Sequence, residues 1–223
     1  AQEVPGSQVG LTQFICGALL MSRLTAKTLG SLVFSLNLVL TGALLSAAPP
    51  AVTSLFPRGA AAGSTAEITI TGKSAADWKA WSSRPGLAVE IPAASSTVKI
   101  TVSPDAEPGI AFLRFFDGEG TSSPVPFVIG RLPEVTEVEP NASIDKAQVI
   151  EQSSVINGKL AESADVDHYS IAVKQGQTLV AVASANWKLG SPVDMVLQLL
   201  TEQGVVLEQV DDDRENDPLI TYA

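Results

Sequence analysis

Apolar and polar residues alternate with a period of two along most of the chain from Ala51 onward. In the segment 65–72, Ile68 and Ile70 share one face, while the polar residues around them share the other. This alternation predicts a half-buried strand, because successive side chains of a strand point to opposite faces. The same pattern, interrupted by Gly, Pro, Ser and Asp, predicts a first series of strands at 52–56, 65–72, 88–91, 97–102, 110–116 and 125–129.

A second series of strands is predicted after Pro133. Its members show the same alternation and lie at 154–160, 168–173, 178–184, 195–201, 205–210 and 219–222. The glycine-centred triplets 175–177 and 202–204 lie between such runs and predict hairpin turns. A helical period occurs only over 75–81, and it is short.

Regularly spaced strands with turn residues between them predict an all-β fold made of two β-sandwich domains. The first, over residues 49–132, is expected to be immunoglobulin-like, and the second covers residues 133–223. Because the chain stops within a strand-like run, we expect it to be a fragment whose second sandwich is incomplete.

The segment 29–48 departs from the alternation because nearly all its residues are apolar or small. Arg23 and Lys27 precede it, and small residues end it, so the pattern over about 21–48 predicts a secretory signal peptide. An uncleaved membrane anchor remains the alternative, because the run has about the length of a bilayer span. We expect residues 1–48 to lie outside the fold, and the protein to be secreted, periplasmic or on the cell surface.

Acidic residues dominate the charge, with 24 Asp and Glu against 14 Lys and Arg and a formal net charge of −10. Such a surface repels nucleic-acid phosphates and anionic lipid heads, which argues against nucleic acid as a partner and against membrane contact beyond the leader. It is compatible with cation binding. The single cysteine, Cys16, precedes the leader, so stability has to come from packing or from a metal.

Five side chains with oxygen atoms stand at alternate positions on two short stretches. Glu137, Glu139 and Asn141 form the first stretch, and Asp165 and Asp167 form the second. Carboxylate and amide oxygens are the ligands that Ca²⁺ prefers, so the five residues predict a structural calcium site if folding brings the stretches together. The alternative is a solvated acidic linker and an Asp-rich turn, because Asp and Asn favour turns without any metal.

The acidic run 211–217 is similar to the start of an EF-hand loop but does not complete one. Asn216 stands at the sixth position, which requires glycine, and Tyr222 stands at the twelfth, which requires a bidentate glutamate. We expect a turn with solvated carboxylates here, with a second cation site as the alternative.

His168 is the only histidine, so any zinc site or Ser-His-Asp triad would depend on it. Adjacent strand residues point to opposite faces, which places Asp167 badly for orienting the imidazole. The chain also lacks a Gly-x-Ser-x-Gly motif. We therefore expect no catalytic residue, an exposed His168, and Tyr169 turned to the core.

The three tryptophans, Trp78, Trp81 and Trp187, are expected to pack in the core or at sheet edges. A platform for a sugar or a peptide is the alternative.

Six short motifs occur in an order that resembles the bacterial pre-peptidase C-terminal domain, over about residues 134–223. They lie at 137–141, 157–158, 165–169, 174–177, 190–194 and 211–218. The resemblance implies a secreted, non-catalytic, jelly-roll-like sandwich, found beside extracellular proteases and in large bacterial surface proteins. The family's closing strand pair is absent. Residues 49–132 resemble an IPT/TIG-type immunoglobulin-like domain through 54–59, 63–65 and Gly72.

Some relatives with this domain, among them collagenase collagen-binding domains, bind Ca²⁺ through the linker before the first strand and a carboxylate loop. The resemblance implies linker ligands at Glu137, Glu139 and Asn141, and loop ligands at Asp165 and Asp167. Ala142 stands where the family often has an acidic residue, which implies weaker binding or a water in that place.

The chain is therefore expected to be a non-catalytic secreted or cell-surface spacer and binding module with a calcium-ordered linker. An extracellular protein or a polysaccharide is the expected partner. The alternative is an accessory region of an extracellular protease or other hydrolase whose catalytic domain lies beyond residue 223.

Overall fold

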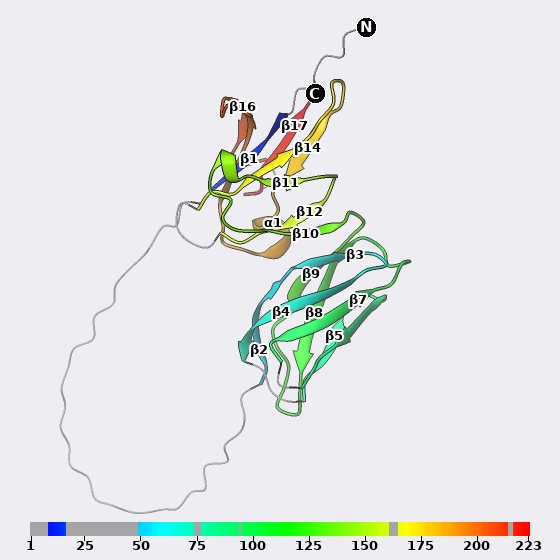
Figure 1. The fold of residues 1–223 in the computed structure, drawn as a ribbon. Helices are drawn as coiled ribbons and strands as arrows, with labels where there is room; N and C mark the ends of the chain where they lie inside the picture. The colour runs from blue at the N-terminus through cyan, green and yellow to red at the C-terminus, as the bar shows by residue number, and fades with distance from the viewer. Residues whose placement is uncertain (1–8, 17–48, 74–76, 94, 161–164, 214–215) are drawn as a thin grey trace, which may run out of the picture.

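The computed structural model describes residues 9–16, 49–73, 77–93, 95–160, 165–213 and 216–223, and it confirms the all-β fold (Figure 1). The predicted leader at 21–48 lies outside the described residues. Among the residues described, no helix is long and apolar enough to cross a bilayer.

Two four-stranded sheets form the first sandwich. One has the order β2 (Ala51–Phe56), β4 (Thr65–Lys73), β7 (Thr97–Val102), β6 (Leu87–Glu90). The other has the order β3 (Gly59–Ala61), β9 (Val125–Gly130), β8 (Gly109–Phe116), β5 (Lys79–Ser82). Alternate residues of both sheets meet in one core, where Leu55, Ile68, Ile100, Phe115 and Phe127 are all at most 2% exposed.

The second group of strands builds three sheets. The largest has the order β11 (Gln148–Ile150), β13 (His168–Ile171), β1 (Val9–Cys16), β15 (Met195–Thr201), β16 (Val206–Val210). Two pairs complete the group: β10 (Glu134–Thr136) with β12 (Val155–Asn157), and β14 (Leu179–Val182) with β17 (Leu219–Tyr222). Leu197, Leu199 and Ile220 form its core. Two short helices, η1 (Ile144–Lys146) and α1 (Asn186–Leu189), lie in its loops.

Strand β1 differs from the expectation that residues 1–48 lie outside the fold. It pairs in antiparallel fashion with β13, where Gln13 is opposite His168, and with β15, where Phe14 is opposite Leu197. The segment therefore lies in the interior of the five-stranded sheet, although it precedes the predicted leader in sequence.

The other differences are local. The predicted hairpin at 202–204 is present, because β15 and β16 pair on either side of it and Thr201 N–H donates to the carbonyl of Val205 over 2.8 Å. The triplet 175–177 is a turn, with Gln177 N–H donating to the carbonyl of Lys174, but its flanking strands β13 and β14 belong to different sheets. Strand β5 begins within the segment that showed a short helical period.

The two sandwiches lie end to end, with β10 beside β3 and α1 beside β9 (Figure 1). Arg58 joins them through its Nη1, which donates to the carbonyl of Leu189 over 2.8 Å. The Lys159 ammonium lies 3.8 Å from the centre of the Phe56 ring, a cation–π contact between the two sandwiches.

Candidate metal centre

The linker after β10 and the start of β13 lie side by side. Glu137 N–H donates to the carbonyl of Asn157 over 3.0 Å, which continues the β10–β12 pairing into the linker. His168 N–H donates to the carbonyl of Asn141 over 3.0 Å. This bond holds the end of the linker against the residue that follows Asp167. Folding therefore brings together two stretches that are separated in sequence.

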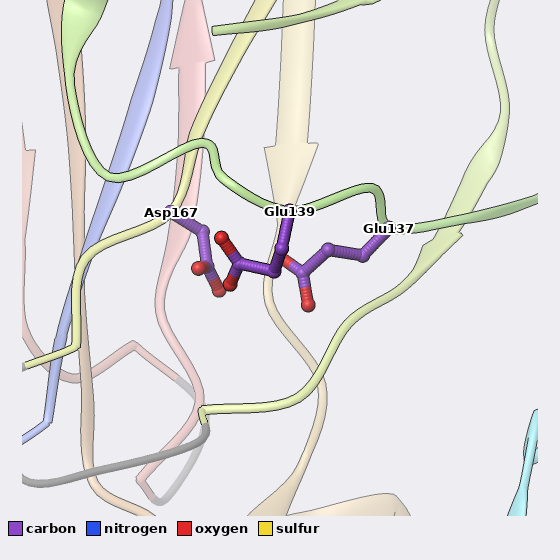
Figure 2. A group of neighbouring side chains, drawn as sticks. All are labelled: Glu137, Glu139 and Asp167. Atoms are coloured by element: carbon purple, nitrogen blue, oxygen red, sulfur yellow. The ribbon is translucent and has the colours of Figure 1, made fainter. Parts of the chain in front are cut away.

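Three carboxylates meet at this junction, and Glu137, Glu139 and Asp167 are named here the carboxylate cluster. One oxygen from each lies within 4.8 Å of those from the other two, and Figure 2 shows all three side chains converging. Asp167 is buried, Glu137 half-buried and Glu139 exposed. Burial, and then the neighbouring charge of Glu137, raises the pKa of Asp167 to about 8.

Two polar oxygens in the cluster region are buried without a hydrogen-bond partner. They are Oδ1 of Asn141, a residue that is 0% exposed, and Oδ1 of Asp167, which is 3% exposed. The amide of Asn141 is directed into the cluster, because its Nδ2 donates to Glu137 Oε1 over 2.9 Å. A buried polar atom left unpaired costs about 1–3 kcal/mol, and a bound cation would offset that cost for both oxygens.

Glu137 is held by three donors. Its Oε1 accepts from the Tyr169 hydroxyl over 2.5 Å and from Asn141 Nδ2, and its Oε2 accepts from Lys159 N–H over 2.7 Å. A carboxylate offers about four lone-pair sites, so Glu137 retains one for a cation. Burial and the Glu137 carboxylate also raise the pKa of Tyr169, which keeps the phenol protonated as a donor.

Gly158 gives this arrangement the space it needs. A Cβ at this position would lie 3.1 Å from both Glu137 Oε2 and the Tyr169 hydroxyl, closer than side chains normally approach. Tyr169, Gly158 and Lys159 were not among the site residues predicted from the sequence. Tyr169 could have been found, because residues two apart on a strand share a face and Asp167 was already a candidate.

Asp165 is the sequence-predicted ligand that stands apart. Asp165 is not one of the three described carboxylates that converge in the cluster. Its Oδ1 accepts from Val166 N–H over 3.0 Å. Its charge still contributes to the raised pKa of Asp167. The structure thus brings Glu137, Glu139, Asn141 and Asp167 together, with Asp165 in the outer surroundings.

The expectation of an exposed His168 is wrong, because the residue is only 5% exposed. It lies on β13, an interior strand between β11 and β1. Its ring Nδ1 lies 3.2 Å from the Asn141 carbonyl that also accepts its backbone N–H. Burial lowers the pKa of His168, which favours the neutral ring. The residue thus helps to hold the end of the linker, at Asn141, against β13. Tyr169 is buried, as predicted.

The other acidic run is mostly solvated. Asp194, Asp211 and Asp212 also bring carboxylate oxygens within 4.8 Å of one another, but all three residues are exposed. Asp217 is buried and accepts from the N–H groups of Ala185 and Asn186 over 3.0 and 2.9 Å, which caps the start of α1. Of the described residues in this run, 211–213 are exposed, as predicted, whereas the burial of Asp217 departs from the prediction of solvated carboxylates.

No model of a known protein family matches the chain, and no curated protein matches it. The resemblance to the pre-peptidase C-terminal domain therefore rests on the motifs in the sequence. The donor set at the candidate metal centre consists of oxygens alone, which suits a hard cation such as Ca²⁺ or Mg²⁺.

Proposed function

We propose that the chain is an exported, non-catalytic spacer and binding module whose interdomain linker is ordered by Ca²⁺ at the carboxylate cluster. The observation that supports this most is the burial of two unpartnered oxygens, on Asn141 and Asp167, beside three converging carboxylates. Without a cation, such a site combines like-charge repulsion with unsatisfied polar atoms. Ca²⁺ tolerates irregular oxygen geometry better than Mg²⁺, which requires a near-ideal octahedron.

The cation would act on the contact between the two sandwiches. Glu137 Oε2 accepts from Lys159 N–H, and the Lys159 side chain contacts Phe56 of the first sandwich. The neighbouring Asn157 donates from its Nδ2 to Glu134 Oε2 over 2.6 Å. Its Oδ1 accepts from the backbone N–H of Arg58 over 3.4 Å. The segment 157–159 therefore lies between the cluster and the first sandwich. A cation that fixes Glu137 would restrict the motion of this segment and, through it, the motion of the first sandwich relative to the second.

Export would expose the carboxylate cluster to a higher concentration of Ca²⁺. Ca²⁺ is abundant outside cells and scarce within them, so the linker would become ordered only after export. The motifs that resemble the pre-peptidase C-terminal domain support an extracellular setting. In this proposal the metal acts on geometry and stability and takes part in no reaction.

Calorimetric titration of Ca²⁺ into the full chain tests the proposal. We expect one ion to bind at the cluster, and we expect Asp167→Asn to abolish that binding because it removes the most buried anionic ligand. Asp211→Asn is the matched control, since it removes a carboxylate from the exposed acidic group instead. The absence of both a heat of binding and a change in melting temperature would overturn the proposal.

A further inference from the structure

The outer face of the sheet β3-β9-β8-β5 leaves large aromatic side chains in solvent. Along β8, Leu113 and Phe115 point inward and are 0% exposed, whereas Phe112 is 46% exposed. On the edge strand β5, Trp81 is 53% exposed and pairs directly with Arg114 of β8. Paired residues of antiparallel strands share a face, so both side chains project from the outer face of the sheet.

Trp78 differs from Trp81 in its burial. Trp78 is 7% exposed and packs with its ring centre 5.5 Å from that of Phe115 in the core. Trp78 packs in the core and Trp81 lies on an edge strand, the two places predicted for tryptophan, but the side chain of Trp81 is left half exposed. A tryptophan side chain carries about 150–250 Å² of surface, so leaving it half in water forgoes much of the free energy that burial would supply.

Trp81 borders a hollow of about 580 Å³ whose walls are Trp81, Arg114, Phe116 and the turn 117–121, named here the aromatic hollow. It is shallow and open to solvent, so it offers a surface more than an enclosed cavity. The turn is held in place, because Asp117 Oδ1 accepts from the N–H groups of Glu119 and Gly120 over 2.8 and 3.1 Å. Asp117 N–H also donates to the carbonyl of Gly120. The polar wall is therefore preformed.

We propose that the aromatic hollow binds a neutral polysaccharide. A pyranose ring has a face of C–H groups and a rim of hydroxyls, and it requires a flat apolar platform bordered by hydrogen-bonding groups. Trp81 supplies the platform, while Arg114 and Asp117 supply donors and acceptors of opposite charge at its border. This mixture of signs, on a chain with a net charge of −10, disfavours polyanions such as sulfated glycans. The hollow is open to solvent, which suits an internal segment of a polymer.

The proposal is tested by titrating the full chain with cellohexaose, xylohexaose and chitohexaose, followed by calorimetry and indole fluorescence. We expect at least one hexasaccharide to bind in a one-to-one complex. Trp81→Ala should weaken binding by about tenfold, the value expected for loss of one aromatic contact, and Trp81→Phe should retain part of it. Because Trp81 is exposed, both variants should keep the wild-type melting temperature.

Phe112→Ala is the matched control, since Phe112 is exposed on the same outer face but does not line the hollow. It should bind the hexasaccharide as the wild type does. Equal losses for Phe112→Ala and Trp81→Ala would show a broad hydrophobic docking face and overturn the polysaccharide proposal. Failure of all three hexasaccharides to bind, or unchanged binding by Trp81→Ala, would overturn it as well. None of these outcomes depends on the carboxylate cluster.

Discussion

At the scale of single residues, Asn141 and Asp167 carry the argument for a cation. A carboxylate on the surface needs no explanation, but these two residues are buried beside other acids and each leaves an oxygen unpaired. The surrounding hydrogen bonds fix their positions without satisfying those atoms. Tyr169 and Asn141 both donate to Glu137 Oε1, which orients one carboxylate of the cluster.

The raised pKa of Asp167 predicts how the metal-free protein responds to pH. Its pKa is about 8 in the folded chain, against about 4 for an unfolded aspartate, so the folded state binds the proton more tightly. Stability in chelator should therefore fall as the pH rises from about 4 to about 8. Ca²⁺ replaces the proton and should remove most of this fall. Melting temperatures at pH 5 and pH 8 check it, and an unchanged pH dependence in Asp167→Asn would contradict it.

Tyr169→Phe tests the orientation of Glu137. The change keeps the buried ring and removes only the hydroxyl that donates to Glu137 Oε1, so the fold should be retained. Loss of a bond that orients a metal ligand typically costs tenfold or more in affinity, and we expect the calcium dissociation constant to rise by about tenfold. Tyr222→Phe is the matched control at the only other tyrosine. Equal affinities for the two variants would contradict the orienting role of Tyr169.

At the scale of elements, alternation from Ala51 onward predicted the longer strands well and the shortest ones poorly, whereas the eight-residue strand β1 was not predicted. Strands β7, β15 and β17 have the predicted bounds, and a turn residue directly precedes each of them, namely Ser96, Asp194 and Pro218. Strands β3, β10 and β11 have three residues each, too few to show a period. The candidate ligands were visible as alternating acids. The burial of Asn141 could not be predicted, because it depends on β13, which begins 27 residues later in the chain.

Strand β1 makes a prediction about processing. Cleavage of the predicted leader at about residue 48 would remove β1 together with it, which leaves β13 and β15 without a partner on one side. A chain comprising residues 49–223 should therefore show faster amide hydrogen exchange in β13 and β15 than the full chain. Exchange in β4 and β7 of the first sandwich is the internal control. Equal protection of β13 and β15 in both chains would contradict a structural role for β1.

At the scale of the whole molecule, the carboxylate cluster lies on the segment that joins the two sandwiches. Among the described residues, the contacts between the sandwiches include the Arg58 Nη1 bond to Leu189, the Arg58 N–H bond to Asn157 Oδ1 and the Lys159 contact with Phe56. Interfaces of this kind permit relative motion, so an ion that fixes Glu137 and thereby Lys159 would limit it.

Spin labels placed one on each sandwich should report this restriction. We expect the distribution of distances between them to narrow when Ca²⁺ is added, because the segment 157–159 becomes fixed against the first sandwich. Lys159→Ala should still bind Ca²⁺ but lose most of the narrowing, since the backbone N–H that contacts Glu137 remains and the side chain that contacts Phe56 does not. Distance distributions that are identical with and without Ca²⁺ would contradict the proposal that the ion restricts motion between the two sandwiches.

The most direct test of the calcium site is a crystal structure of the full chain grown with Ca²⁺. The account predicts an ion about 2.3–2.6 Å from carboxylate oxygens of Glu137, Glu139 and Asp167 and from Oδ1 of Asn141. An ion bound only at the exposed group of Asp194, Asp211 and Asp212, or no ion at the carboxylate cluster at saturating Ca²⁺, would contradict it.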